Sequence, residues 1–353
     1  MSFISAKEAA AKWNISQRRV SILCSENRIC GAMMVGNMWI IPFNAEKPID
    51  KRTIRYEKQV TIKPFVKWVG GKGQLVGELN KLIPINGEYF LTKYAEPFVG
   101  GGALLFNILS KYSFNEIYIG DINTELINTY RVVKSSVTNL INALLEMQNN
   151  YLPLDDDSRK IYYYNVRKKF NDLQLSEKNS LQKAALFIFL NKTCFNGLYR
   201  VNRKGEFNVP MGAYKNPTIC DKDNLQNVSQ ALQNVTIQCG DYTKSKAFID
   251  NATLVYLDPP YRPLSATSNF TAYNLNCFDD NEQHRLAKFV DEISEIGAKI
   301  LLSNSDPQNT NIDDTFFEKL YSKYKINKVE ATRMINSNSE KRGKINELLI
   351  CNY

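Results

Sequence analysis

A carboxylate, two prolines and a tyrosine stand together at Asp258-Pro259-Pro260-Tyr261, directly after the apolar run LVYL. The run predicts a buried strand, and ligands of open α/β sheets collect where strands end. The exocyclic amine of a nucleobase is a poor nucleophile because its lone pair is delocalised into the ring. The Asp258 carboxylate and the proline-restricted Pro259 carbonyl could accept both amino hydrogens while the Tyr261 ring stacks on the base. The motif indicates chemistry at a base amine, although a purely structural proline turn that ends a strand would have the same sequence pattern.

A glycine-rich turn, AEPFVGGG at residues 95–102, follows another strand-like run and precedes a helical one. Glycines let the backbone approach a ligand and form the tight strand-to-helix turn of nucleotide folds. The pattern differs from G-x-G-x-x-G, which argues against a nicotinamide cofactor. Asp121 comes 21 residues after Gly100, close to the roughly 20-residue offset at which an acidic side chain binds ribose hydroxyls. Asp121 could also cap the helix that begins near INTEL.

The segment KWVGGK at residues 67–72 is not a phosphate-binding loop. The Walker pattern requires a glycine at position 66 and Ser or Thr after the lysine, whereas the chain has Val66 and Gly73. The site therefore offers a ligand glycines, an aromatic side chain and an acidic partner for ribose, but no loop that would bind a phosphate. S-adenosylmethionine fits such a site.

The segments that carry these motifs alternate between strand-like and helix-like patterns. Strand-like runs occupy 88–98, 116–123, 253–261 and 299–304, helix-like runs include 103–112 and 125–147, and a terminal hairpin ends in INELLICNY. This alternation predicts an α/β fold with parallel strands and covering helices. Residues 151–235 interrupt it with Tyr- and Lys-rich helices and the irregular stretch NKTCFNGLYRVNRKGEFNVPMGAY. We interpret them as an inserted, mostly helical domain.

The N-terminal residues read as helix, turn, helix and hairpin. Residues 5–13 are Ala-rich after a serine cap, 14–16 break the helix, 17–27 form a second helix, and Gly36-Asn37 joins two β-prone runs. This pattern resembles small winged helix-turn-helix modules of the excisionase type, whose second helix enters the major groove and would here present Arg18 and Arg19. A folded cap or partner-binding domain is the alternative. A charged linker at 46–62 follows.

The net charge of +9 is unevenly distributed. Residues 1–67 hold 12 basic and 5 acidic side chains, and residues 159–206 hold 11 and 3, so the remainder sums to −6. Two basic segments on an acidic remainder favour two surfaces that meet a polyanion, with nucleic acid the leading candidate. Solvated helix faces would give the same totals.

Several classes of site are excluded by residue counts. The seven cysteines are scattered without a C-x-x-C pair, and His284 is the only histidine, so we expect neither a disulfide framework nor a metal site. No apolar run reaches the roughly 18 residues that a membrane span requires. The N-terminus lacks the pattern of a signal peptide, so we expect a cytoplasmic protein.

The whole motif set closely resembles the Dam-type DNA adenine-N6 methyltransferases, the α class or D12 class. The set comprises KWVGGK, EPFVGGG, Asp121-Ile122-Asn123, NGLYRVNRKGEFNVPMGAY, DPPY, SATSNFTAY and LLSNSD, in the family's order from about residue 63 to the C-terminus. The resemblance implies a Rossmann-like S-adenosylmethionine-dependent sheet, an inserted target-recognition domain and a double-stranded DNA substrate, with GATC as the target.

The resemblance also implies roles for individual residues. The cofactor-binding set is Trp68, Lys72, Glu96, Phe98, Gly100, Gly102, Asp121 and Asp258, and the set that holds the flipped adenine is Asp258, Pro259, Pro260 and Tyr261, with Phe270 or Tyr273 as further candidates. The DNA-contacting set is Lys67, Phe195, Asn196, Leu198, Arg200, Pro210 and Tyr214. Some relatives have tyrosine where this chain has Phe195. Arg200 could pair bidentately with guanine, while Lys192, Arg203 and Lys204 suit phosphates.

We therefore expect a monomeric enzyme that methylates N6 of a flipped adenine in duplex DNA, without a metal or a covalent intermediate. The expected domains are a helix-turn-helix module at 1–45, a linker at 46–62, a catalytic domain at 63–150 and 236–353, and a target-recognition domain at 151–235. The alternatives are cytosine-N4 methylation, a class that more often has Ser in place of Asp258, and a DNA-binding regulator with an inactive core.

Overall fold

The computed structural model describes residues 2–25, 29, 31–45, 47, 62–68, 70–84, 89–262, 278–332 and 344–353. Contacts within the chain divide it into two units, residues 1–60 and 61–353. No helix in the described ranges is long and apolar enough to cross a membrane.

The described residues of the first unit form two helices and a small antiparallel sheet of order β1-β3-β2. These elements are β1 (Phe3–Ser5), α1 (Ala6–Trp13), α2 (Gln17–Ser25), β2 (Met33–Val35) and β3 (Met38–Pro42). Ser5 and Glu8 form a capping box at the start of α1, and Asn14 ends that helix with a φ of 52°. Both predicted helices and the predicted hairpin are present. The sequence did not indicate β1, which is too short to show alternation.

The second unit is built on a seven-stranded sheet of order β6-β5-β4-β7-β8-β10-β9. The strands are β4 (Lys93–Glu96), β5 (Glu116–Asp121), β6 (Val235–Cys239), β7 (Thr253–Leu257), β8 (Lys299–Ser305), β9 (Lys325–Thr332) and β10 (Lys344–Cys351). The first five in sheet order are parallel, and β10 runs antiparallel to both β8 and β9. The predicted parallel sheet and terminal hairpin are therefore present. Strand β6 was not predicted, because VTIQC is short and mixes polar with apolar residues, as edge strands do.

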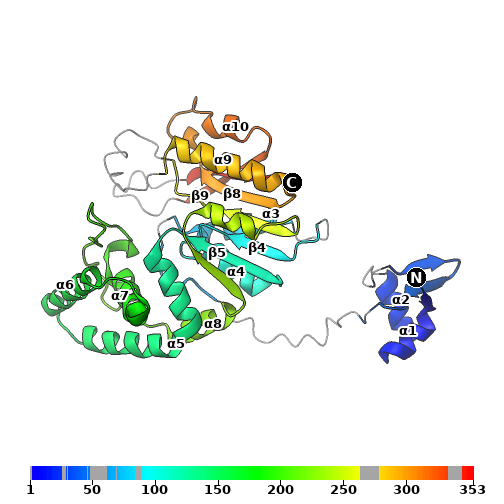
Figure 1. Ribbon diagram of the computed structural model, residues 1–353, viewed down its shortest axis with the longest axis horizontal. Coiled ribbons are helices and arrows are strands. Elements are labelled where there is room, and N and C mark those ends of the chain that lie inside the picture. Colours follow the sequence, from blue (N-terminus) through cyan, green and yellow to red (C-terminus); the bar gives the residue numbers. More distant parts are fainter. Residues whose placement is uncertain are drawn as a thin grey trace. The chain divides into compact units, whose positions relative to one another are not determined.

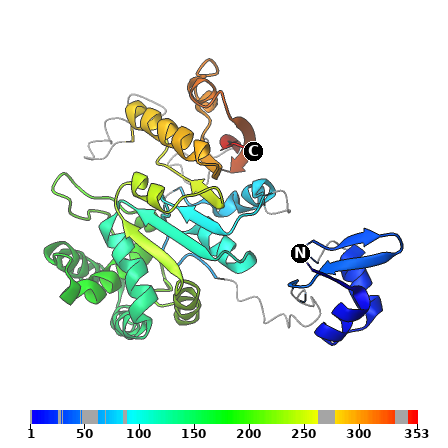
Figure 2. The same cartoon turned by 45° about the vertical axis from the view of Figure 1, so that its right-hand side comes forward.

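Alternate strand residues face two different hydrophobic layers, as a sheet covered on both sides requires. Tyr94 and Leu254 join the core that contains α3 (Val76–Leu82), α4 (Ala103–Lys111), α5 (Thr124–Tyr151) and α8 (Lys222–Ala231). Ala95 and Val255 join the core that contains α9 (Asp280–Glu295) and α10 (Phe316–Leu320). In Figures 1 and 2, α9 lies on the opposite side of the sheet from α5 and α8. The sheet is therefore the middle of three layers.

Two further helices, α6 (Asp156–Asp172) and α7 (Ser180–Thr193), lie beside α5 and away from α9 and α10 (Figure 1). They hold the irregular stretch that follows α7. The Tyr163 hydroxyl donates to the Val209 carbonyl at 2.8 Å, and the Asn171 amide bonds both backbone groups of Phe207 at 2.9 and 3.1 Å. The irregular stretch is thus fixed to the helices by side-chain hydrogen bonds to its backbone rather than by a regular sheet.

Candidate active site

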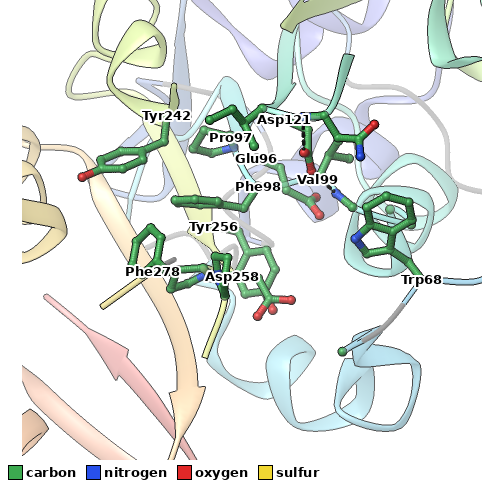
Figure 3. A pocket seen from close by; sticks show the side chains of 18 of the residues that line it. Trp68, Glu96, Pro97, Phe98, Val99, Asp121, Tyr242, Tyr256, Asp258 and Phe278 are labelled. Carbon is green, nitrogen blue, oxygen red and sulfur yellow. Dashed lines mark hydrogen bonds between the residues drawn. The ribbon is translucent and has the colours of Figure 1, made fainter. Parts of the chain in front are cut away.

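A cavity of about 870 Å³ lies at the carboxyl ends of β4, β5, β6 and β7. The volume is within the range of pockets for small ligands and cofactors. All the residues predicted to contact the cofactor or the reacting amine line it: Trp68, Lys72, Glu96, Phe98, Gly100, Gly102, Asp121, Asp258, Pro259, Pro260 and Tyr261. Figure 3 shows Trp68 on one side of this space and Phe98, Tyr242 and Phe278 on the other. Segments far apart in the sequence therefore converge on one site.

The glycine turn after β4 brings backbone against the Trp68 ring. Gly100 has a φ of +48°, and a Cβ built there would lie 2.7 Å from Cδ1 of Trp68. A side chain at this position would displace the indole, so the close approach requires glycine. Gly102 is the N-cap of α4, so the first turn of that helix begins beside the cavity.

Asp121 at the end of β5 holds the glycine turn. Its carboxylate accepts hydrogen bonds from the backbone N–H of Gly100 at 3.1 Å and of Asn123 at 2.9 Å. The expectation that Asp121 caps the following helix is wrong, because Asn123 is the N-cap of α5 and accepts from the Leu126 N–H at 2.8 Å. Burial raises the pKa of Asp121. A carboxylate has about four acceptor positions, so it can still bind a hydroxyl.

Aromatic rings form a wall of the cavity beyond the glycine turn. The Phe98 ring lies 5.1 Å from that of Tyr242 and 5.9 Å from that of Phe278, measured between centroids. Arg285 of α9 pairs with Asp241 through two hydrogen bonds of 2.8 and 2.9 Å, and its guanidinium lies 4.9 Å from the Tyr242 centroid. These contacts fix an apolar, ring-sized wall next to a carboxylate.

The Asp258 side chain is oriented by two contacts to one of its oxygens. Lys72 Nζ lies 2.9 Å from Oδ1, and the Ser303 hydroxyl donates to the same oxygen at 2.9 Å. Ser303 is in turn 3.0 Å from the Tyr256 hydroxyl. Burial raises the pKa of Asp258 and the Lys72 charge opposes that rise. Within the described part of the chain, Oδ2 is thus the oxygen that remains available to a substrate.

The Tyr261 hydroxyl accepts a hydrogen bond from Lys72 and donates one to Glu347 of β10. Lys72 is only 5% exposed, and its Nζ lies 4.2 Å from the Tyr261 ring centroid. Burial, together with the charges of Asp258 and Glu347, raises the pKa of Tyr261 far above its usual value, so the hydroxyl keeps its proton. Lys72 therefore connects the carboxylate and the aromatic ring of the DPPY motif.

Glu96 is a second carboxyl group at the base of the cavity. It accepts a hydrogen bond of 2.6 Å from the Tyr94 hydroxyl, and burial raises its pKa to about 8. At neutral pH the group is therefore mostly protonated. With Glu96 neutral, the carboxylates that contact Lys72 are those of Asp258 at 2.9 Å and Glu347 at 3.8 Å.

The residues predicted to contact DNA lie outside the cavity, on the 3-10 turn Phe195–Gly197 and the loops around it. Lys67, Asn196, Arg200 and Pro210 are exposed, Leu198 and Tyr214 are half-buried, and the Phe195 side chain is 50% exposed. In the first unit, Arg18 is exposed and Arg19 is half-buried on α2. The candidates Phe270 and Tyr273 lie outside the described residues.

Several residues that line the cavity or contact its lining were not found from the sequence. Asp241 and Tyr242 follow β6, and a prediction of that strand would have placed them at the same sheet edge as Asp121. Glu347 gave one weak signal, an acidic residue within the otherwise apolar run ELLIC. The described residues contain no cluster of three or more His, Cys, Asp and Glu side chains that could hold a metal ion.

Comparison with known proteins defines the class. A family model described as D12 class N6 adenine-specific DNA methyltransferase matches residues 68–335, and the chain belongs to this family. The chain is 50% identical over 294 residues to the type II methyltransferase M.MjaIII of Methanocaldococcus jannaschii, covering 83% of this chain and 99% of that protein.

Two other relatives are more distant. The type II methyltransferase M1.LlaDCHI of Lactococcus lactis subsp. cremoris is 37% identical over 299 residues, which cover 84% of this chain and 98% of the relative. The DNA adenine methylase of Escherichia coli is 36% identical over 285 residues, which cover 81% and 93%.

Family membership confirms the predicted class and activity. The chain is an enzyme that methylates adenine in DNA, of the EC 2.1.1.72 type. Its seven-stranded sheet fits the Rossmann-like sheet expected of a methyltransferase. This activity requires a methyl donor and a DNA substrate. Membership of an adenine-N6 family argues against both alternatives, a cytosine-N4 methyltransferase and a regulator with an inactive core.

Proposed function

We propose that this enzyme transfers a methyl group from S-adenosylmethionine to N6 of an adenine flipped out of duplex DNA, with GATC as its target. The orientation of Asp258 supports this proposal most strongly. Lys72 and Ser303 both contact Oδ1, so Oδ2 is directed to a substrate amine. The Pro259 carbonyl, next in the chain, is the second proposed acceptor. Together they hold both N6 hydrogens and turn the nitrogen lone pair toward the methyl donor.

The cavity fits the proposed cofactor. Asp121 has acceptor capacity for ribose hydroxyls, the wall of Phe98, Tyr242 and Phe278 suits a purine ring, and the close approach of Gly100 to Trp68 leaves backbone at the cavity surface. We assign the same role to Lys72, Glu96 and Gly102, which line this space. When bound, S-adenosylmethionine supplies a methyl group already activated by its sulfonium.

The rest of the DPPY motif is assigned to the flipped base. Tyr261, fixed by Lys72 and Glu347, offers its ring as a stacking surface. Pro259 and Pro260 restrict the backbone so that the carbonyl and the ring keep their positions. The chain's own part in the reaction is thus to bind and orient the amine, to accept its hydrogens, one of which is released as a proton on methylation, at Asp258 and the Pro259 carbonyl, and to exclude water.

DNA binding is assigned to two regions. Within residues 151–235, proposed as the target-recognition domain, the surface residues Phe195, Asn196, Leu198, Arg200, Pro210 and Tyr214 face the duplex together with Lys67. Arg200 is oriented by Asn208, which accepts from its Nε at 2.7 Å. Residues 1–45 are proposed as a winged helix-turn-helix module that uses Arg18 and Arg19, followed by a linker at 46–62. Residues 63–150 and 236–353 form the proposed catalytic domain.

A plasmid protection assay tests the activity and the target together. Unmethylated plasmid DNA is incubated with the enzyme and S-adenosylmethionine, then treated with nucleases that are either blocked or activated by adenine methylation at GATC. We expect protection from the first and sensitivity to the second. Methylated adenine without either change would show that another sequence is the target. No transfer from S-adenosylmethionine would contradict the cofactor assignment.

Substitution of Glu347 tests whether the Tyr261 hydroxyl must be held. Glu347 is 8% exposed, accepts from Tyr261 and lies 3.8 Å from Lys72 Nζ. We expect Glu347→Leu to lower kcat by about tenfold, because Tyr261 and Lys72 lose a shared partner. Glu347→Gln keeps an acceptor for Tyr261 and should lose less. Single-turnover kinetics on a duplex with 2-aminopurine next to the target would report base flipping, and equal kcat values in both variants and wild type would exclude this role.

Removal of residues 1–60 tests the proposed helix-turn-helix module. These residues form a separate unit, and the family match begins at residue 68. We expect the shortened chain to methylate the same site, with duplex affinity several-fold weaker at low salt because basic side chains are lost. Equilibrium binding over a salt series and mapping of the methylated site measure both effects. Loss of site selection in the shortened chain would instead place target choice in this unit.

A further inference from the structure

Two buried asparagines hold residues 62–68 in the same way. Asn224 of α8 accepts from the Lys63 N–H at 2.9 Å and donates to the Lys63 carbonyl at 3.0 Å. Asn191 of α7 makes the same pair of bonds to Lys67, each at 2.7 Å. A side-chain amide has one acceptor oxygen and donor hydrogens, so it can satisfy a backbone N–H and C=O as a neighbouring strand would.

Asn191 makes one bond more than Asn224. Its Nδ2 also donates to the Gly197 carbonyl at 3.1 Å, so one amide joins Lys67 to the turn Phe195–Gly197. The two segments also touch directly: Gly197 has a φ of +64°, and a Cβ there would lie 2.5 Å from Cβ of Lys67. The position therefore requires glycine, and the turn and Lys67 are packed as one piece.

This piece includes most of the proposed DNA-contacting surface in the second unit. Lys67 Nζ lies 3.9 Å from the ring centroid of Tyr214. The Phe195 N–H donates to the Pro210 carbonyl at 2.9 Å, which ties the turn to the following loop. Asn191 itself is 4% exposed, so it lies beneath the surface that DNA would meet.

We propose that Asn191 is a positioning residue for target-site discrimination, and that it acts by fixing Lys67 and the turn Phe195–Gly197 relative to each other. The inference rests on the proposed function, in which Lys67 and the turn contact base edges. Base recognition depends on hydrogen bonds whose geometry tolerates about half an ångström of error. A buried amide that joins two base-contacting segments sets that geometry without touching DNA.

The test compares Asn191→Asp with Asn224→Asp in the full chain. Each substitution replaces the donating Nδ2 by an oxygen and keeps the volume, so each disturbs a clamp on one lysine backbone. Only the first also breaks the bond to the turn. The methylated site is first mapped with wild-type enzyme. The ratio of kcat/KM on that duplex to kcat/KM on duplexes with one base pair changed then measures discrimination, and S-adenosylmethionine binding and Tm are measured in parallel.

We expect the discrimination ratio to fall by about tenfold in Asn191→Asp, the size of one lost base contact. Cofactor affinity should stay near the wild-type value in this variant, and Asn224→Asp should keep the wild-type ratio. If Asn191→Asp does not fold, the discrimination ratio is measured in Asn191→Ser, whose shorter side chain keeps a hydroxyl donor.

Two results would overturn the inference: an unchanged ratio in a folded Asn191 variant, whether or not its Tm and activity fall, or an equal fall in Asn224→Asp. Failure of the proposed function is a separate outcome, because it would appear in wild-type enzyme as transfer to another base or an unmodified GATC site. The ratio is measured at the mapped site in either case.

Discussion

Asp258→Ala is expected to abolish methyl transfer while the protein still binds duplex DNA. In the structure Lys72 and Ser303 both contact Oδ1, and in the proposed mechanism Oδ2 accepts a hydrogen from the amine. Without the carboxylate, the N6 lone pair stays delocalised into the purine ring and one of its two acceptors is lost. The loss of a preorganised electrostatic contact of this kind costs about 10²- to 10³-fold or more in kcat. The proposed DNA-contacting residues lie outside the cavity, so duplex affinity should change little.

The measurement is transfer of labelled methyl groups to a duplex, together with equilibrium DNA binding. Asp258→Asn should be nearly as inactive, because its amide can present a donor where the N6 hydrogens need an acceptor. Asp250→Ala is the matched control, since Asp250 precedes the same strand and pairs with Lys93 at 2.9 Å, far from the cavity lining. Retained turnover in Asp258→Ala would contradict the assignment of this carboxylate.

Lys72→Met is expected to have the second largest effect and to change the pH dependence. Burial raises the pKa of Asp258, and Lys72 opposes that rise. Without the lysine the pKa of Asp258 rises further, so more of the carboxyl is protonated at neutral pH and cannot accept the amine hydrogens. Raising the pH ionises it again. The variant should therefore have low kcat at neutral pH and recover part of it toward alkaline pH.

A pH profile of single-turnover transfer measures this effect. Lys93→Met is the matched control, because Lys93 also pairs with an aspartate at 2.9 Å and lies 5.1 Å from the ring centroid of Phe248. Lys93 begins β4, whereas the cavity lies at the carboxyl end of that strand. Its profile should match that of the wild type. A Lys72→Met profile with the wild-type shape would show that Lys72 does not control the charge of Asp258.

The sequence predicted the sheet well where strands are buried and apolar. Runs such as TLVYL and KILLSN hold consecutive apolar residues, which is typical of strands buried on both faces. Both form strands in the middle of the sheet. The edge strand β6 was missed because VTIQC is only five residues long and mixes polar with apolar residues. In the structure its carbonyls are covered by side chains of α5, as Lys134 donates to Val235 at 2.8 Å and Arg131 to Ile237 at 3.2 Å. Such protection depends on a distant helix and has no local signal.

Three motifs of the cavity lining were predicted because each lies directly after a strand, whereas the roles of Trp68 and Lys72 came from the family resemblance. Parallel strands end at one sheet edge, so residues after β4, β5 and β7 must meet there. The side-chain hydrogen bonds within the site could not be predicted in this way. Glu347 reaches Tyr261 from β10, and Ser303 reaches Asp258 from β8, so both contacts depend on strand order and register.

The roles of single polar residues were also harder to predict than their positions. Asp121 and Asn123 both suit a helix cap, and the structure assigns the cap to Asn123 because Asp121 turns toward the Gly100 N–H. Asn191 is an ordinary residue in a helical sequence, and only the folded chain shows it bridging Lys67 and Gly197. Such bridges join residues distant in sequence, and neither periodicity nor spacing reports them.

The central claim is that the Asp258 carboxylate holds the amine of a flipped adenine beside the methyl donor. A crystal structure of the enzyme with its target duplex and a non-reactive analogue of S-adenosylmethionine tests it most directly. We predict Oδ2 of Asp258 and the Pro259 carbonyl each about 3 Å from adenine N6, with Oδ1 still on Lys72 and Ser303. A carboxylate turned away from N6 in that complex would contradict the account.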